Sequence, residues 1–346
     1  MASVLLDSVS VTRSGNQVIH DLTLSAEDGE LLVLIGPSGC GKTSILRAVA
    51  GLDDTSGGDI LFDGRTMDDV TAAERDVAMV FQDNALIPKK SVRANVAFPL
   101  EVRRVNRDEI DNRVRAEARA LAIERFLERF PEQLAAGHQQ LVQAARALVR
   151  RPSLFLLDEP LSRMDAANRK MMRSEIRLLQ SGYGVTTIYA TNDQEEAMAI
   201  ADRIAVIDDG RLRQIGPPSE IYHRPVDMFV AEFVGSPSMS FIRGEVVDRE
   251  VIIGAGSLPL PAGVRPGAVS VGVRSHDWHV VSTAGLSGTV ASVEHHGDFA
   301  FAEVQLGSDQ VTMRFDTAPT IGDVVEVWTR RFHLFGPSGR AISHIA

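Results

Sequence analysis

The chain has 346 residues, which is enough for about two or three domains with their own hydrophobic cores. Its formal net charge of −10 argues against nucleic acid as the main partner, because duplex binding requires a basic surface. No stretch approaches the roughly eighteen apolar residues of a membrane-spanning helix. The N-terminus lacks the basic region of a signal peptide, so we expect a protein that stays in the cytosol.

Apolar strands alternate with helical patterns through residues 1–235, which predicts an α/β domain with a largely parallel sheet. The expected strands lie at 31–35, 59–62, 77–81, 154–157, 185–189 and 204–207. The expected helices lie at 42–50, 107–130, 137–150, 166–181 and 194–201. The segment from about 85 to 150 interrupts the alternation, and we interpret it as a helical insertion.

The pattern changes after residue 235 to short β-like runs separated by Gly, Pro and Asp turns. These runs lie at 244–247, 269–273, 288–293, 302–306, 311–315 and 324–328. Residues 236–346 are therefore predicted to form a small all-β domain, built as a barrel or a sandwich.

Residues 36–43 read GPSGCGKT, the pattern of a phosphate-binding loop, between an apolar strand and a helical pattern. In such a loop backbone N–H groups surround the phosphates, the lysine reaches the β- and γ-phosphates, and the last hydroxyl ligates Mg²⁺. The pattern predicts binding of a nucleoside triphosphate with Mg²⁺. The candidate binding residues are Gly36, Pro37, Ser38, Gly39, Cys40, Gly41, Lys42, Thr43 and Ser44.

Cys40 is the single cysteine of the chain, which excludes an intramolecular disulfide. It lies near a predicted helix N-terminus, which can lower the pKa of a thiol. Two interpretations stay open, a reactive thiol and an inert small residue.

Asp158 and Glu159 follow the apolar strand at 154–157. Ligands of doubly wound sheets bind beyond the carboxyl ends of the strands, so both acids are expected to face the phosphate-binding loop. Asp158 is placed to hold Mg²⁺ directly or through water. Glu159 is placed to polarise the attacking water as a general base.

Five segments occur in the order found in ATPase subunits of ABC transporters, which the chain resembles over nearly its whole length. They are GPSGCGKT, VFQDNAL (80–86), LFLLDEP (154–160), LSRMD (161–165) and ATNDQEEAM (190–198). With the β-rich C-terminal part and the stretch at 229–246, the chain is similar to sugar importers of the maltose/trehalose type. The resemblance implies a P-loop NTPase fold in residues 1–235, a helical subdomain at about 85–150, and a regulatory β domain at 236–346.

The resemblance also implies a function and partners. ATP with Mg²⁺ would be hydrolysed at the cytoplasmic face of the inner membrane by a peripheral, head-to-tail dimer of two ATPase subunits, identical or different. Two transmembrane permease subunits and an extracytoplasmic solute-binding protein would complete the importer. A sugar is the expected solute, with a polyamine or glycerol-phosphate as alternatives. An ABC ATPase without a permease is a further alternative, although such proteins usually carry paired ATPase domains or long coiled coils.

Two further residues match positions of the family. Gln82 matches the glutamine that touches Mg²⁺ and the attacking water, and its amide can both donate and accept a hydrogen bond. Asp165 matches the acid of the loop that couples the two ATP sites.

The signature segment departs from the family pattern. The sequence Leu-Ser-Gly-Gly-Gln is expected at 134–138, where the chain reads LAAGH. Ala135 lacks the serine hydroxyl that would donate to the γ-phosphate, and Ala136 replaces a glycine. Gly137 and the following helix N-terminus are retained, so this segment stays a candidate contact to the nucleotide.

Two other positions also depart. Asn192 replaces the switch histidine; it can donate a hydrogen bond to a γ-phosphate oxygen but cannot carry positive charge. Arg13 aligns with the aromatic residue that stacks on adenine, and its guanidinium is expected either to stack or to be solvated. The chain is therefore interpreted either as an ATPase whose turnover these departures can reduce, or as an impaired ATP-binding subunit paired with an active ATPase.

Overall fold

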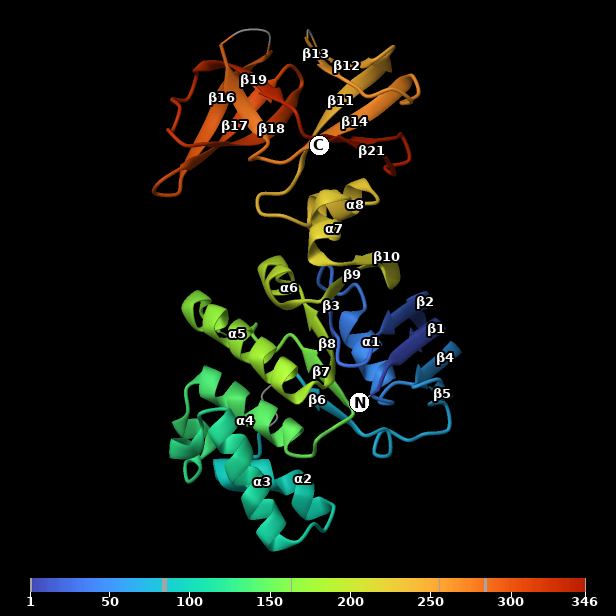
Figure 1. The fold of residues 1–346 in the computed structure, drawn as a ribbon, viewed down its shortest axis with the longest axis vertical. Helices are drawn as coiled ribbons and strands as arrows, with labels where there is room; N and C mark the ends of the chain where they lie inside the picture. The colour runs from blue at the N-terminus through green and yellow to red at the C-terminus, as the bar shows by residue number, and fades with distance from the viewer. Residues whose placement is uncertain (1, 83–85, 163, 255, 283–284, 346) are drawn as a thin grey trace. The chain divides into compact units, whose positions relative to one another are not determined.

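The computed structural model describes residues 2–82, 86–162, 164–254, 256–282 and 285–345. It divides into two compact units, Met1–Pro218 and Ser219–Ala346, each of which is described by itself (Figure 1). Residues 83–85 of the segment VFQDNAL, residue 163 of LSRMD and the expected start of the helical insertion at residue 85 lie outside the described residues.

Within its described residues, the first unit contains a six-stranded sheet in the order β10-β9-β3-β8-β7-β6 and a four-stranded sheet in the order β2-β1-β4-β5. The six-stranded sheet is parallel except for its edge strand β10. The strands are β1 (Val4–Arg13), β2 (Asn16–Ala26), β3 (Leu31–Ile35), β4 (Gly57–Phe62), β5 (Arg65–Thr66), β6 (Val77–Val80), β7 (Leu154–Asp158), β8 (Thr186–Thr191), β9 (Arg203–Asp208) and β10 (Arg211–Gly216).

The helices of the first unit lie among these strands. They are α1 (Lys42–Val49), α2 (Val92–Val102), α3 (Arg107–Ala120), α4 (Ala136–Leu148), α5 (Ala166–Tyr183) and α6 (Gln194–Ile200), with short 3₁₀ turns at Glu124–Phe126 and Pro131–Gln133. Figure 1 shows α2, α3 and α4 gathered together, and their apolar faces share one cluster that includes Val96, Val114 and Val142.

Strand β3 is apolar along its whole length because both faces of the sheet are covered. All residues of β3 and β7 are buried. Helix α1 packs its buried face, with Ile45 and Leu46, into a cluster that also holds residues of β1, β2 and β3. The predicted α/β fold with a largely parallel sheet is confirmed.

The prediction of one continuous helix over 107–130 is wrong. Helix α3 ends at Ala120, and Ala122 adopts a left-handed backbone with φ of 53°. The N–H of Ile123 then donates to the carbonyl of Ala118 at 2.8 Å. Ile123 and Phe126 are buried in the helical cluster, so the chain folds back to bury apolar side chains that a straight helix would leave in solvent.

The second unit contains two sheets that share one hydrophobic core. Within the described residues their strand orders are β13-β12-β11-β14-β20-β21 and β15-β19-β16-β17-β18. The strands are β11 (Ser240–Val247), β12 (Glu250–Ile253), β13 (Gly256–Pro259), β14 (Gly267–Val273), β15 (Trp278–Val281), β16 (Leu286–His295), β17 (Ala300–Leu306), β18 (Asp309–Phe315), β19 (Val324–Thr329), β20 (Phe332–Phe335) and β21 (Ala341–Ile345). The predicted β-rich C-terminal region is confirmed.

Two helices precede these strands, α7 (Pro218–His223) and α8 (Met228–Phe233). The N–H of Met228 donates to the carbonyl of Gly339, and the N–H of Ala341 donates to that of Val226. These bonds explain why the second compact unit begins at Ser219, whereas the sequence placed the boundary between residues 235 and 236. The boundary between an ATPase domain (1–235) and a regulatory domain (236–346) stays a prediction.

The side chain of Arg274 connects these two helices to the strands of the second unit. This side chain is buried, and its guanidinium lies 3.9 Å from the ring centroid of Tyr222. The guanidinium also donates to the main-chain carbonyls of Tyr222 and Val234. One buried charged group therefore donates to main-chain carbonyls at both α7 and the end of α8.

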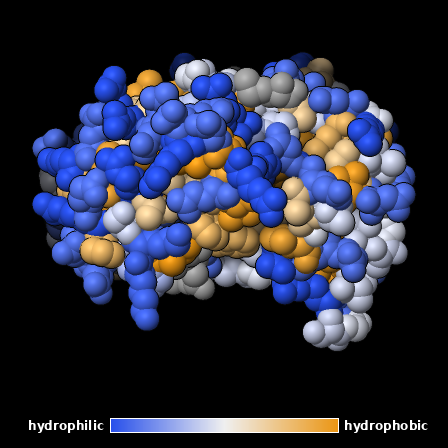
Figure 2. Space-filling view, turned by 90° about the horizontal axis from the view of Figure 1, so that it is seen from below, coloured by the Kyte–Doolittle hydropathy of each residue, from blue (hydrophilic) through white to orange (hydrophobic). Residues whose placement is uncertain are grey.

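None of the described helices is long and apolar enough to cross a membrane. Some apolar side chains are nevertheless exposed, such as Phe98 and Val102 on α2. On the face shown in Figure 2, apolar residues lie in groups among hydrophilic ones.

We expect Arg274→Ala to lower the free energy of unfolding of the second unit by about 3 kcal/mol, because the buried carbonyls lose a charged donor. Trp278 and Trp328, the chain's two tryptophans, both lie in this unit. Urea unfolding of the full chain followed by tryptophan fluorescence therefore measures the effect. The control Arg243→Ala removes an exposed ion pair with Asp309 and should cost less than about 1 kcal/mol. Equal losses in the two variants would contradict this role of Arg274.

Candidate functional site

The phosphate-binding loop lies between β3 and α1, and neighbouring elements leave no room for side chains at two of its glycines. A Cβ atom on Gly36 would lie 2.0 Å from the carbonyl oxygen of Ile207. Gly41 has a φ of 107°, and a Cβ there would lie 2.7 Å from Cδ1 of Ile19. The glycines therefore allow the close approach of backbone that a loop around phosphates needs.

Lys42 begins α1, and its side chain is only 5% exposed. Its Nζ donates to the carbonyl oxygens of Gly36 at 2.7 Å and Pro37 at 2.9 Å. These acceptors are neutral, so the ammonium charge stays available to attract phosphate oxygens. The position agrees with the predicted role of this residue in a phosphate-binding loop.

Cys40 is buried beside Lys42, and its Sγ lies 3.7 Å from the ammonium nitrogen. Burial raises the pKa of the Cys40 thiol, although the nearby Lys42 partly opposes this. Of the two interpretations that the sequence left open, the raised pKa favours the inert one.

The parallel register brings several predicted residues to one edge of the sheet. Asp158 pairs with Ala190 on β8, so Glu159 and Asn192 both follow these neighbouring strand ends. On the other side of β8, Thr191 pairs with Ile35, the residue before the loop. The carboxyl ends of β3, β7 and β8 therefore meet where the loop begins.

Thr43 and Asp158 are in direct contact at this edge. The hydroxyl of Thr43 donates to Oδ1 of Asp158 at 3.0 Å, and Asp158 is 4% exposed. Burial raises the pKa of Asp158, and the hydrogen bond from Thr43 opposes the shift. A hydroxyl and a carboxylate are ligands that Mg²⁺ prefers, so these residues fit the predicted metal site.

The side-chain amide of Gln82 contacts Glu159, the residue after Asp158. Its Nε2 donates to Oε2 of Glu159 at 2.9 Å. Glu159 has a left-handed φ of 44°, and its N–H donates to the carbonyl of Ala190. Such a backbone costs about 1–3 kcal/mol in a residue with a side chain and is often found at functional sites. The turn and the amide of Gln82 together orient the Glu159 carboxylate.

The LAAGH segment lies in a different part of the first unit. Helix α4 mainly contacts α2, α3 and β6, whereas α1 contacts β2, β7 and β8. Ala135 is the N-cap of α4 and provides no side-chain cap, unlike Ser91 at the start of α2. His138 lies 4.3 Å from the ring centroid of Phe126, and burial lowers the pKa of its imidazole.

Arg13 forms an ion pair with Asp53, at 3.7 Å between Nε and Oδ2, and its side chain is half exposed. The same carboxylate accepts hydrogen bonds from Arg47 of α1, which lower the pKa of Asp53. A carboxylate thus holds the Arg13 guanidinium beside α1.

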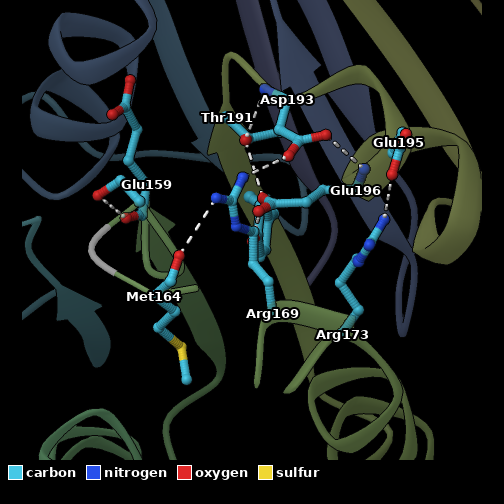
Figure 3. Close-up of polar contacts among 10 residues, drawn as sticks. Glu159, Met164, Arg169, Arg173, Thr191, Asp193, Glu195 and Glu196 are labelled. Carbon is cyan, nitrogen blue, oxygen red and sulfur yellow. Dashed lines mark hydrogen bonds and ion pairs between the residues drawn. The ribbon is translucent and has the colours of Figure 1, made fainter. Parts of the chain in front are cut away.

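The sequence analysis missed the polar residues that hold the turn around Asn192 (Figure 3). The hydroxyls of Tyr189 and Thr191 donate to Oε2 of the buried Glu196, at 2.7 and 2.9 Å. The carboxylate of Asp193 accepts from the N–H of Glu196 and caps α6. The signal in the sequence was the spacing of Asp193 and Glu196, which matches a helix N-terminal capping pattern.

Comparison with known families matches residues 19–162 to the family described as ABC transporter. The chain is 40% identical to the sn-glycerol-3-phosphate import ATP-binding protein UgpC 3 of Agrobacterium fabrum, over 99% of this chain and 100% of the relative. It is 41% identical to the protein of the same description in Paracoccus denitrificans, over 99% of both chains.

Solved structures agree with this relationship. The cbiO1 protein of Clostridium perfringens, part of the ABC transporter complex cbiONQ, has a TM-score of 0.60 and 26% identity, covering 63% of this chain and 89% of its own. A dimeric ATP-binding cassette in a post-hydrolysis state, bound to ADP and Pi, has a TM-score of 0.56 and 27% identity, covering 62% of this chain and 98% of its own. The P-loop fold of the ABC type predicted from the sequence is confirmed.

We expect Lys42→Ala to weaken binding of Mg·ATP by at least about 100-fold, or ~2.8 kcal/mol, because the loop loses its side-chain cation. Titration with a fluorescent ATP analogue measures the affinity. The control Lys170→Ala removes an exposed lysine of α5 and should bind as the wild type does. Unchanged affinity in Lys42→Ala would refute the assignment of the loop.

Proposed function

The chain belongs to the ATP-binding proteins of ABC transporters and is an ATPase that uses ATP with Mg²⁺, and we propose that it powers the import of a small polar solute. One observation carries the proposal. The phosphate-binding loop, Asp158 and Glu159 lie at the edge where the carboxyl ends of β3, β7 and β8 meet.

The chemistry is assigned to residues of this edge. Lys42 and the backbone N–H groups of the loop bind the phosphates. Thr43 and Asp158, with Gln82, hold Mg²⁺, which when bound neutralises phosphate charge. Glu159 acts as the general base on the attacking water, and the hydrogen bond from Gln82 keeps its carboxylate in place.

Three positions that depart from the family pattern are assigned to the nucleotide. Asn192 donates to a γ-phosphate oxygen at the end of β8. The LAAGH segment, with Ala135 and Gly137, provides only backbone N–H groups at the start of α4, and these act on the ATP of the second subunit. Arg13 lies beside the adenine.

The names of the relatives favour one class of solute. Both relatives described above are named for the import of sn-glycerol-3-phosphate. Glycerol-phosphate was an alternative to a sugar in the sequence analysis, and we now propose a polyol phosphate as the solute. The proposed partners are a second ATPase subunit, two permease subunits and an extracytoplasmic solute-binding protein. The proposed location is the cytoplasmic face of the inner membrane, peripheral to it.

Uptake by cells that contain the complete transporter tests this proposal. We expect radiolabelled sn-glycerol 3-phosphate to accumulate with the wild type. Glu159→Gln should reduce uptake at least about 100-fold while retaining ATP binding, because the base is lost and the fold is kept. Accumulation of maltose instead would contradict a polyol phosphate as the solute and would support a sugar. Full uptake by Glu159→Gln would contradict the role of Glu159.

A second candidate, an ATP-binding subunit of low turnover, is favoured by the observed signature segment. Ala135 provides no side-chain cap at the start of α4, and His138 packs on Phe126. Asn192 replaces a histidine of the family. In a head-to-tail homodimer every ATP site would combine both departures, whereas pairing with an intact subunit would leave one departure at each site.

Restoration of the family residues separates the two candidates. If each departure costs about 100-fold and the effects add, a homodimer carrying Ala135→Ser, Ala136→Gly, His138→Gln and Asn192→His should gain about four powers of ten, or ~5 kcal/mol of barrier. ATP turnover is measured for single and combined variants, with the exposed Ala199→Ser as control. Turnover of tens per second in the unmodified homodimer would show that LAAGH and Asn192 are tolerated.

A further inference from the structure

Arg169, on α5, joins two loops of the first unit (Figure 3). Its Nη2 donates to the carbonyl oxygen of Met164 at 3.2 Å, and its Nη1 lies 3.0 Å from Oδ2 of Asp193. Met164 precedes α5 and is the neighbour of Asp165. Asp193 directly follows Asn192. One guanidinium therefore connects the segment before α5 to the turn that carries Asn192.

Met164 extends this connection to the LAAGH segment. Its side chain is buried, and a Cβ atom on Gly137 would lie only 2.8 Å from its Cε. The side chain thus lies directly against the start of α4, while the main-chain carbonyl of the same residue is held by Arg169. A displacement of the LAAGH segment would shift this carbonyl, because close-packed interiors transmit small displacements.

Asp193 follows Asn192 in the chain and is hydrogen-bonded to the residues around it. Its carboxylate accepts from the N–H of Glu196, and its own N–H donates to the hydroxyl of Thr191. Thr191 in turn donates to the buried Glu196. The residues on both sides of Asn192 are therefore held by hydrogen bonds, and the ion pair of Asp193 with Arg169 connects this turn to α5.

We propose that Arg169 is a positioning residue that couples the LAAGH segment to Asn192, through Met164 and Asp193. The inference rests on the proposed function, in which the LAAGH segment acts on the ATP of the second subunit and Asn192 on the ATP of its own. Arg169 then lets contact with one nucleotide adjust the turn at the other. Its effect is on the placement of Asn192, without contact to the nucleotide itself.

The chain contains a matched control for this pair. Arg173 lies one turn further along α5 and forms an ion pair with Glu195 of α6, at 3.6 Å. Both pairs connect α5 to the start of α6, one at its N-cap residue Asp193 and the other at Glu195 inside the helix (Figure 3). Glu195 lies further from Asn192 in the chain. A general loss of packing between α5 and α6 would affect both pairs.

The experiment compares Arg169→Gln, Asp193→Asn, their double variant and Arg173→Gln in the full chain with Mg·ATP. Asparagine can still cap α6, so Asp193→Asn removes the charge and keeps the cap. Amide hydrogen exchange of residues 190–193 should be about tenfold faster in Arg169→Gln and in Asp193→Asn than in the wild type. The double variant should exchange no faster than either single variant. Arg173→Gln should exchange as the wild type does. Arg169→Lys, which keeps the charge but not the fork of donors, should be intermediate.

Turnover and affinity are measured on the same proteins. ATP turnover should fall about tenfold in Arg169→Gln with an unchanged KM, and Mg·ATP affinity should stay within about twofold. Additive exchange effects in the double variant, or an equal effect of Arg173→Gln, would overturn the proposal. Failure of the wild type to bind Mg·ATP would instead overturn the proposed function. Exchange without nucleotide would then still decide whether Arg169 orders residues 190–193.

Discussion

The parallel hydrogen-bond register of the central sheet is the constraint on which the site depends. The phosphate-binding loop, Glu159 and Asn192 each follow a strand end. The pairing of Ile35 with Thr191 and of Asp158 with Ala190 makes these segments neighbours. A slip of one residue would turn buried side chains of β3 and β7 toward the opposite face. Because both faces are covered by apolar packing, the register that buries the core is also the register that assembles the site.

Two charged side chains, Lys42 and Asp158, are buried at the same edge. Lys42 is buried against neutral carbonyls, and Asp158 is buried with a raised pKa and a single hydroxyl donor from Thr43. Burial of charged groups is costly unless opposite charges or metal ions compensate it. In the proposed function, phosphates and Mg²⁺ would provide this compensation, so binding of the nucleotide would relieve this cost.

Two of the departures from the family pattern, the LAAGH segment and Asn192, are connected through the interior of one subunit. Gly137 lies against Met164, whose carbonyl accepts from Arg169, and Arg169 pairs with Asp193 beside Asn192. The contacts join a segment at the start of α4 to a turn after β8. The signature segment and the switch position therefore share a structural context, although they are far apart in the sequence.

The sequence by itself determined the α/β fold, the phosphate-binding loop and the two acids after β7, because buried strands and glycine-dependent turns leave local patterns. It did not show the bulged pairing of β1 with β2, which breaks the alternation of buried residues. The end of α3 at Ala120 and the anchoring of α7 and α8 by Arg274 were decided by the tertiary structure. So were the contacts of Arg169. Each depends on partners distant in the sequence, and local periodicity carries no information about which distant residue a side chain will meet.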